Sequence, residues 1–261
     1  MKSYLRFLSR NKLYTAIEVV GLSVALAFVL IIGSYVWQEY SISRENPDYE
    51  RIYIPTQSMP YGIFEPMKEQ IPEIEKITLV NSFDDVVMEC DDERLVTRGL
   101  AVRGDFFDIF DYEFLIGDAG CLESYTDIVI SESYAAKLAG KPELAVGMKI
   151  VPVDYPSQAY TVTGIIKDFD QNYWKYMDFI CKGESPLNDS AQKNPIFTLS
   201  ATAFIKVAES ADVDSLEGKI QAIFKQLWGE KMKAAMIDQF TVNLGIERFD
   251  KLYFSGEMID S

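Results

Sequence analysis

The sequence predicts an α+β fold in which a single N-terminal transmembrane helix is followed by a large outer body of mixed helices and strands. Two observations support this fold class. Residues 19–37 form an uncharged apolar run, and no other stretch reaches the length of about 18 apolar residues that a membrane span needs. The residues after position 40, about 220 in number, alternate between strand-like and helix-like patterns and are numerous enough to bury a sizeable core.

The apolar run has the length and the flanking residues of a membrane span. It holds 19 positions without a charge, and as an α-helix it is roughly 28 Å long, close to the thickness of the bilayer hydrocarbon. Aromatic residues that suit the two membrane interfaces stand near its ends, at Tyr14, Tyr35, Trp37 and Tyr40. We therefore expect a transmembrane helix over residues 14–40.

A cleaved signal peptide is the alternative interpretation of the same run. Ala25-Leu26-Ala27 has the small-x-small pattern of a cleavage site, but cleavage there leaves the apolar residues 28–32 on the mature chain. A retained anchor fits the length of the run better.

The charges around the run predict its orientation. Four basic residues precede it without an intervening acid: Lys2, Arg6, Arg10 and Lys12. Because cytoplasmic loops carry the excess of Lys and Arg, we expect the N-terminus inside and the outer body outside. The residues after Lys12 hold 21 basic and 40 acidic side chains, a formal charge of −19. This charge argues against nucleic acid as a partner and against a body that lies flat on anionic lipid.

The basic N-terminus also has a helical pattern. Lys2, Arg6 and Arg10 recur every four residues, so a helix places them on one face. We interpret residues 1–13, with Lys12 as a further basic residue, as an elbow helix that lies on the inner membrane surface. A frayed basic tail is the alternative.

Small residues within the membrane span form two spaced pairs. Gly21 with Ala25, and Ser23 with Ala27, have the small-xxx-small spacing that lets a second membrane helix approach closely. We expect helix packing at these four positions. The alternative is a helix that is surrounded by lipid, since small residues are common in membrane helices.

The outer body offers no recognisable catalytic or cofactor motif. The chain has no histidine, no GxxxxGK[ST] phosphate loop and no GxSxG nucleophile turn. Ser131, Ser133, Tyr134 and Lys137 resemble a Ser-Lys or Tyr-Lys pair, but the SxxK spacing is absent and the positions suit an ordinary helix. The sequence therefore predicts no catalytic residue, no cofactor and no metal.

Acidic residues gather at two places without forming a calcium motif. One group is Asp84, Asp85, Glu89, Asp91, Asp92 and Glu93. It lacks the alternating ligands and turn glycine of a DxDxDG loop, so we interpret it as a solvated acidic loop. The other group, Asp105, Asp108 and Asp111, alternates with Phe and fits the wet side of an aromatic turn.

Three cysteines stand far apart, at Cys90, Cys121 and Cys181, and none has zinc-ligand spacing. Outside the cytoplasm they allow one disulfide with one free thiol. Three buried thiols is the interpretation that we favour.

Local patterns predict the elements of the outer body. Strands are expected at 51–59, 76–83, 94–102, 126–131, 147–153, 159–169 and around 196–208, and helices at 64–71, 131–140 and 212–229. Ser131 is the expected N-cap of the second helix and Gly140 its stop. Gly229 is the expected end of the third helix.

Six segments follow one another along the chain: "YLRFLSRNKLYTAIEVVGLSVALAFVLIIGSYVWQEYS", "VRGDFFDIFDYEFLIGD", "DIVISESYAAKLAG", "GMKI", "VTGIIKDF" and "ERFDKLYFS". In this order they resemble a known family, the MacB/FtsX-like ABC transporter permeases, whose outer region is called the MacB-like periplasmic core domain. The first segment is similar to the N-terminal elbow and first membrane helix of these permeases.

The resemblance implies a two-lobed periplasmic domain over residues 41–261. One lobe is a porter-like α+β unit from about residues 45–115 and 195–255, and the other is a β-rich insert from about 116–194. It also implies an inner-membrane location, a cytoplasmic ABC ATPase subunit, a second permease copy and a periplasmic protein partner. Such a permease couples ATP hydrolysis by its partner to motion of the periplasmic domain, in efflux or envelope mechanotransmission, and does no covalent chemistry itself.

The resemblance has one departure. A permease of this family continues into three more membrane helices, whereas this sequence stops at Ser261. It is then either a piece of a longer chain or a reduced relative. For a reduced relative, the alternative function is a free-standing membrane-anchored module that binds or senses a periplasmic partner.

Overall fold

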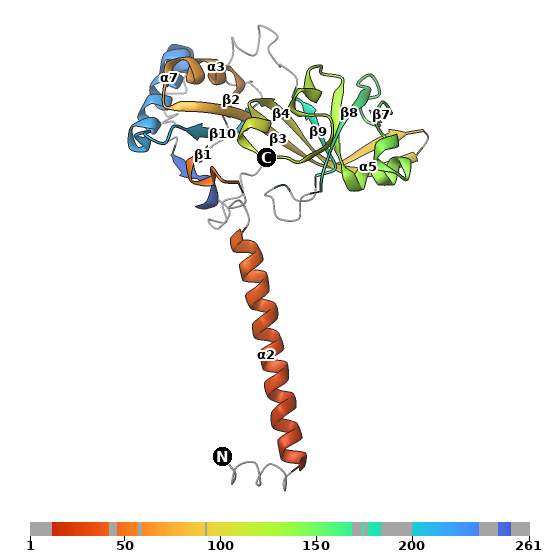
Figure 1. The fold of residues 1–261 in the computed structure, drawn as a ribbon. Helices are drawn as coiled ribbons and strands as arrows, with labels where there is room; N and C mark the ends of the chain where they lie inside the picture. The colour runs from red at the N-terminus through yellow and green to blue at the C-terminus, as the bar shows by residue number, and fades with distance from the viewer. Residues whose placement is uncertain are drawn as a thin grey trace.

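A computed structural model describes residues 12–41, 46–56, 59–91, 93–168, 174, 177–183, 200–234 and 245–251. Its first element, α2 (Lys12–Ser41), projects away from a wide body of strands and helices (Figure 1). The large apolar side chains of α2 are between 50% and 78% exposed, because nothing in the described part of the chain packs against them. α2 is the one described helix that is long and apolar enough to cross a membrane, with a mean hydropathy of 2.5 over residues 12–37.

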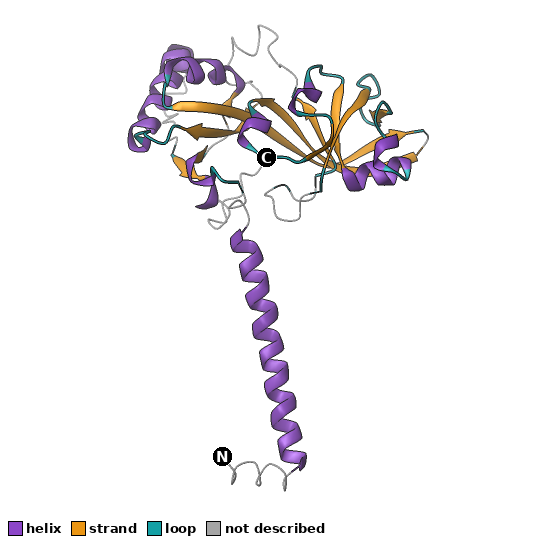
Figure 2. Cartoon of the chain, in the orientation of Figure 1, coloured by secondary structure: helices purple, strands orange, loops and turns teal. Residues whose placement is uncertain are grey.

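The body is a mixture of helices and strands, which confirms the predicted α+β class (Figure 2). Its strands run in the order β11-β1-β10-β3-β4-β9-β6-β8-β5, and β2 and β7 pair outside this path. Two long antiparallel strands, β3 (Ile74–Cys90) and β4 (Glu93–Gly104), extend through both halves of the body. The two halves are therefore joined by continuous backbone hydrogen bonding.

The first half is a sheet that is covered on one face by helices. Its other strands are β1 (Ile52–Pro55), β2 (Met59–Pro60), β10 (Ser200–Val207) and β11 (Ile246–Arg248). The helices α3 (Phe64–Gln70) and α7 (Val213–Ala234) lie together over it (Figure 1). Apolar side chains of α3 and α7, such as Met67, Leu216 and Ile220, form one buried cluster with Ile77 and Ile205 of the sheet.

The second half is a small barrel. Strand pairing runs from β3 to β4, β9 (Phe179–Lys182), β6 (Asp127–Ser131), β8 (Tyr160–Ile166) and β7 (Lys149–Pro152), and β7 pairs with β3 again. The six strands therefore form a closed ring. Alternate side chains of these strands, such as Met88, Ile128 and Val162, are buried together with residues of α5 (Glu132–Ala139).

A third buried cluster lies where the sheet meets the barrel. It contains Phe106, Ile109 and Phe110 from α4 (Phe106–Ile109) and its C-terminal end, packed on β1, β10 and Phe249. It also contains residues of the barrel strands, namely Val129, Ile166 and Ile180. Aromatic rings dominate its centre: the ring centroids of Phe110 and Trp174 are 4.8 Å apart and those of Phe110 and Phe204 are 5.2 Å apart. The lobe boundaries given above remain predictions, since α4 contacts both halves.

The start of α5 follows the sequence prediction. Ser131 is its N-cap, with an extended backbone and a hydroxyl that accepts a hydrogen bond from the Tyr134 amide at 3.2 Å. Gly140 ends the helix with φ of 72°, a conformation that glycine adopts without a steric penalty.

Three local expectations are wrong. Asp84, Asp85 and Glu89 lie within β3 and not in a loop, because Val86, Met88 and Cys90 alternate toward the barrel interior and continue the strand. A bulge between Phe83 and Val86 accommodates the two aspartates, and Asp85 has φ of 55°. Asp92 lies outside the described residues.

The third helix passes through Gly229 and continues to Ala234, so Gly229 does not end it. A glycine inside a helix costs only about 1 kcal/mol, and the Glu-Lys-Met-Lys that follows it consists of good helix formers. The strand expected over 51–59 is interrupted, since β1 ends at Pro55 and β2 begins at Met59.

All three cysteines are free thiols in the structure, and the disulfide alternative is not formed. Cys90 and Cys181 are buried, but Cys121 is half-buried, so the expectation of three buried thiols holds for two of them. Burial raises the pKa of the Cys181 thiol to about 11 and raises that of Cys90 above its ordinary value. Both buried thiols are therefore protonated at neutral pH.

Candidate functional site

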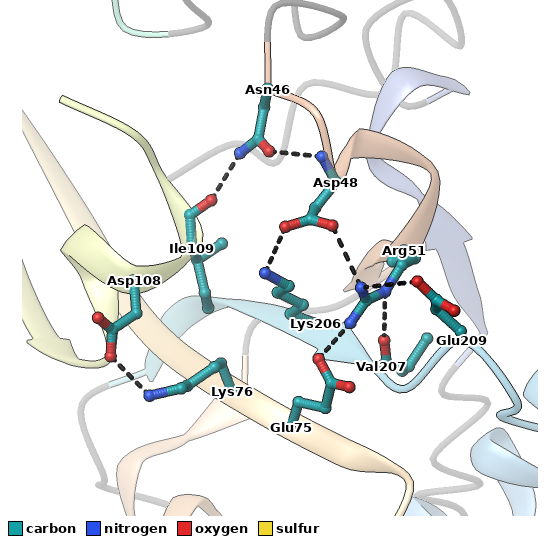
Figure 3. A network of polar contacts seen from close by, with 10 residues as sticks. All are labelled: Asn46, Asp48, Arg51, Glu75, Lys76, Asp108, Ile109, Lys206, Val207 and Glu209. Atoms are coloured by element: carbon teal, nitrogen blue, oxygen red, sulfur yellow. Dashed lines mark hydrogen bonds and ion pairs between the residues drawn. The ribbon is translucent and has the colours of Figure 1, made fainter.

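A polar joint attaches residues 46–51, the first described segment after α2, to the sheet and α4 of the outer body (Figure 3). It begins five positions after the last residue of α2 and includes the 3₁₀ turn η1 (Tyr49–Arg51). The amide of Tyr49 donates to the Asn46 carbonyl at 3.1 Å, and the amide of Arg51 donates to the Asp48 carbonyl at 2.8 Å. These bonds hold the segment in a compact turn and direct its side chains toward the sheet.

The first arm of the joint is an ion-paired contact with β10. The carboxylate of Asp48 accepts hydrogen bonds from Lys206 and from Arg51, where the Nη1–Oδ1 distance is 3.2 Å. The side chain of Lys206 is only 14% exposed. Arg51 also donates from Nε to the carbonyl of Val207 at 2.9 Å. Residues 48 and 51 are thus fixed to residues 206 and 207, which are more than 150 positions away in sequence.

Two further carboxylates lie beside the cations of this arm. Arg51 donates through Nη2 to Glu75 at the start of β3, and its Nη1 lies 3.9 Å from Glu209. Two cations therefore meet three carboxylates, so each positive charge has a partner of opposite sign. A charged pair in such a half-buried place has stronger attraction than on an open surface, because less water screens it.

The second arm of the joint is a contact between Asn46 and α4. Asn46 accepts a hydrogen bond from the Asp48 amide through Oδ1 at 2.9 Å, the pattern of an Asx turn. Its Nδ2 donates to the carbonyl of Ile109 at 2.6 Å. Ile109 is the last residue of α4 and is 2% exposed. One side chain therefore links the turn after the membrane helix to the aromatic cluster.

Salt bridges fix α4 against the sheet beside this arm. Asp108 pairs with Lys76 of β3 at 2.6 Å, and this hydrogen bond raises the pKa of Lys76 above its ordinary value. Asp105 pairs with Lys68 of α3 at 2.8 Å and accepts a hydrogen bond from the Ile77 amide at 3.2 Å. The three aspartates were predicted to form the solvent-facing side of an aromatic turn. In the structure the carboxylates of Asp105 and Asp108 are paired with lysines, while Asp111 is exposed.

The strand β11 brings a later part of the chain back to the same base. It pairs with β1 so that Arg248 lies opposite Tyr53, and the Thr56 amide donates to the Gly245 carbonyl at 2.8 Å. Arg248 forms a two-point contact with the buried carboxylate of Asp250 at 2.6 and 2.9 Å. This contact raises the pKa of Arg248 above its ordinary value.

The residues that the sequence predicts as site residues do not belong to this joint. Lys2, Arg6 and Arg10 lie outside the described residues, and Lys12 is the exposed first residue of α2. The four small residues all lie within α2, at Gly21, Ser23, Ala25 and Ala27. At about 100° per residue, Gly21 and Ala25 share one side of the helix, and Ser23 and Ala27 share a side roughly 200° away. The two pairs therefore present separate faces.

The remaining candidates have structural roles. Ser131 is a helix cap, and its hydroxyl lies 3.4 Å from that of Ser133. Tyr134 is 1% exposed, and burial raises its pKa above the ordinary value. Within the described ranges, no group of three or more His, Cys, Asp or Glu side chains lies close enough to hold a metal ion.

The joint itself was not predicted from sequence. Asn46, Asp48 and Arg51 occur in a short polar connection of ordinary composition, and their partners come from β10 and α4. The available signal was the polar stretch at Asn46-Pro47 after the membrane span, which marks a connection but does not reveal its contacts.

An α+β body that follows one apolar helix of membrane-spanning length defines a class of protein, the membrane-anchored extracytoplasmic domain. The comparison with protein families gives the particular family. Residues 15–223 match the MacB-like periplasmic core domain. The chain belongs to this family, which supplies the periplasmic domain of ABC transporter permeases.

Solved structures share the fold. A domain of a protein assigned as a permease from Porphyromonas gingivalis aligns with a TM-score of 0.60 at 19% identity, and the alignment covers 77% of this chain and 89% of that one. The periplasmic region of MacB from Actinobacillus actinomycetemcomitans aligns with a TM-score of 0.52 at 12% identity, covering 78% of this chain and 92% of that one. No curated protein matches the sequence. At these identities the likeness establishes the fold.

Proposed function

We propose that this chain is the permease component of an ABC transporter that couples ATP hydrolysis by a cytoplasmic ATPase subunit to motion of its periplasmic domain. Membership of the MacB-like periplasmic core domain family over residues 15–223 is the observation that carries this proposal. The polar joint supports it, because a membrane helix that drives an outer domain needs a defined attachment to it. The transported substrate or periplasmic partner is a separate question.

The proposal includes an orientation. The N-terminus lies in the cytoplasm and the outer body lies in the periplasm, on the outer side of the inner membrane; the excess of Lys and Arg before the span supports this orientation. Labelling of single cysteines by a membrane-impermeant maleimide in intact spheroplasts tests it. A cysteine placed at the exposed Ser210 is expected to react, whereas one placed at Ser3 is expected to react only after lysis.

The basic elbow is proposed to contact the ATPase or the inner membrane surface beside it. The test replaces Lys2, Arg6 and Arg10 by Glu and measures how much ATPase copurifies with the chain. We expect the ATPase to be lost. The matched control exchanges Lys and Arg at the same three positions, which keeps the charge, and the maleimide assay verifies that both variants insert correctly. Full retention of the ATPase by a correctly inserted Glu variant contradicts the proposal.

A second permease copy is proposed to pack on α2 at the small residues. An added Cβ at Gly21 meets nothing within 4 Å in this chain, so a larger side chain there acts only on a neighbouring helix or lipid. We expect Gly21→Leu with Ala25→Leu to reduce dimer cross-linking in membranes. Gly33→Leu is the matched control, because Gly33 is equally open but lies about 120° around the helix from Gly21. The pair Ser23→Leu with Ala27→Leu tests the other face.

The alternative function is a free-standing anchored module that binds or senses a periplasmic protein. It predicts that no ATPase copurifies with the wild-type chain and that the Glu variant of the elbow keeps its periplasmic binding. The ATPase copurification experiment therefore separates the two functions.

A further inference from the structure

A row of three valines crosses the outer wall of the barrel. Val87 of β3 lies opposite Val96 of β4, and on its other side the amide of Val153, directly after β7, donates to the Val87 carbonyl at 2.9 Å. Residues directly opposite one another in antiparallel strands point to the same face. The neighbouring Val86 and Met88 pack inside the barrel, so Val87 and both of its partners face outward.

The valine row is exposed and continues into an aromatic residue. Val96 is 66% exposed, and Val87 and Val153 are half-buried. Two positions after Val153, Tyr155 is 68% exposed in a turn that its amide closes on the Pro152 carbonyl at 3.1 Å. Figure 1 shows β7 at the end of the body that is remote from α3 and α7. Single exposed apolar residues are ordinary on a protein surface, whereas an aligned row beside an exposed aromatic ring is typical of an interaction site.

Charged side chains flank the valine row, and acids are in excess among them. Arg94 pairs with Glu89 at 2.6 Å on one side of the row. Arg98 pairs with Asp84 at 3.4 Å on the other side, so both cations already have partners. Four more exposed acids in the same strands and turns form no ion pair within the described residues, namely Asp85, Asp91, Glu93 and Asp154. The rim of the valine row therefore carries a net negative charge.

We propose that the valine row, with Tyr155 and the acidic rim, docks a periplasmic partner protein through a segment that presents aliphatic side chains flanked by Lys or Arg. The aliphatic part follows from the row, since exposed apolar side chains leave water by packing against other apolar groups. The basic part follows from charge complementarity, because the rim repels an acidic surface and attracts a basic one. The same charge argues against a second copy of this chain, whose matching surface is equally acidic. The inference rests on the proposed periplasmic location of the body and is independent of coupling to an ATPase.

Photo-cross-linking of the full chain, in the cells in which the protein is native, tests this docking surface. The chain carries p-benzoylphenylalanine in place of Tyr155, which is an exposed aromatic residue of similar shape. The matched control position is Leu144, which is 64% exposed in the turn η4 (Pro142–Leu144) beside α5. Adducts are isolated, and mass spectrometry identifies the cross-linked peptides.

We expect an adduct at the probe position with a different protein, through a segment that is aliphatic and basic, and no such adduct at the control position. Val96→Ser should lower the adduct yield at least about threefold, because it removes apolar contact area. Asp154→Lys should lower the yield by a similar factor, because it reverses a charge of the rim. Val146→Ser and Glu143→Lys make the same changes at exposed positions beside the control position, and both should leave the yield unchanged.

Four results overturn the proposal. These are a yield at Tyr155 no higher than at Leu144, an adduct with a second copy of this chain, an adduct through an acidic segment, and a yield that Val96→Ser or Asp154→Lys does not lower. Val96 and Asp154 are exposed, so neither variant removes a core contact. Maleimide labelling at position 210 verifies the orientation of each variant. Failure to form the adduct in a correctly oriented chain therefore counts against the docking surface alone, and loss of ATPase copurification leaves this assay untouched.

Discussion

Replacing Asp48 by Asn should destabilise the outer domain by removing the charge that two cations share. Lys206 is 14% exposed and Asp48 is 30% exposed, so the pair is neither open to water nor fully buried. Breaking a buried pair costs about 3–5 kcal/mol, and an exposed pair contributes about 0.2–1 kcal/mol. Because an Asn side chain still accepts one hydrogen bond, we expect a loss of about 2 kcal/mol in the free energy of unfolding.

Thermal unfolding of the full chain in detergent, followed by circular dichroism, measures this loss. A change of about 2 kcal/mol lowers Tm by about 4–8 °C for a domain of this size. Asp84→Asn is the matched control, because Asp84 is 71% exposed and lies 3.4 Å from its partner Arg98. Its effect should stay below about 0.5 kcal/mol.

A double-mutant cycle tests the reasoning behind the magnitude. In Asp48→Asn, the Lys206 cation loses its full charge partner. Lys206→Met removes that cation, so the double variant should lose less stability than the sum of the two single variants. The reasoning is refuted if the two effects add within about 0.5 kcal/mol, or if Asp48→Asn melts at the same temperature as the Asp84 control.

Three further predictions concern the rest of the body. Gly99→Ala should cost about 1–3 kcal/mol in unfolding free energy, since its Cβ would lie 2.1 Å from the ring of the buried Phe179; an unchanged denaturation midpoint contradicts this. The hydrogen bond from Lys219 lowers the pKa of Glu73 below its ordinary value of 4.5, so the contact stabilises above that pH and is lost as pH falls through the lowered pKa. Protection of the α7 amides from hydrogen exchange, after correction for the intrinsic pH dependence of the exchange rate, should therefore fall below pH 4.5 in the wild type, with Glu73→Gln showing a smaller dependence. The Cys181 thiol, buried and with a pKa of about 11, should react with maleimide at pH 8 only when the domain unfolds; rapid alkylation of the folded chain opposes this.

Much of the fold follows from local sequence patterns. The apolar run predicts α2, and the strand–helix sequence from Asp127 to Gly140 predicts both elements with the Ser131 cap, because caps and periodicity depend on neighbours within a few residues. The continuation of β3 through Asp84 and Asp85 was missed, since a bulge shifts the alternation and places two acids together.

Local sequence patterns do not predict the polar joint or the strand pairing that closes the barrel. The partner of Asp48 is Lys206, and β3 pairs with residues as distant as Val151 and Pro152. Nothing in the residue types of a polar turn specifies which distant lysine it meets. Long-range pairing is determined by how the sheet, α4 and the barrel pack together, which no local pattern specifies.

The contacts within the body and at the joint differ in strength, and this difference determines where motion can occur. Truncating a buried aromatic residue such as Phe106 to Ala typically costs about 3–5 kcal/mol, whereas one hydrogen bond such as that from Asn46 contributes about 0.5–1.5 kcal/mol. A force on residues 46–51 would therefore break the hydrogen bonds and ion pairs of the joint before it disturbs the aromatic cluster. The coupling of helix motion to the periplasmic domain that we propose consequently depends on the strength of the joint.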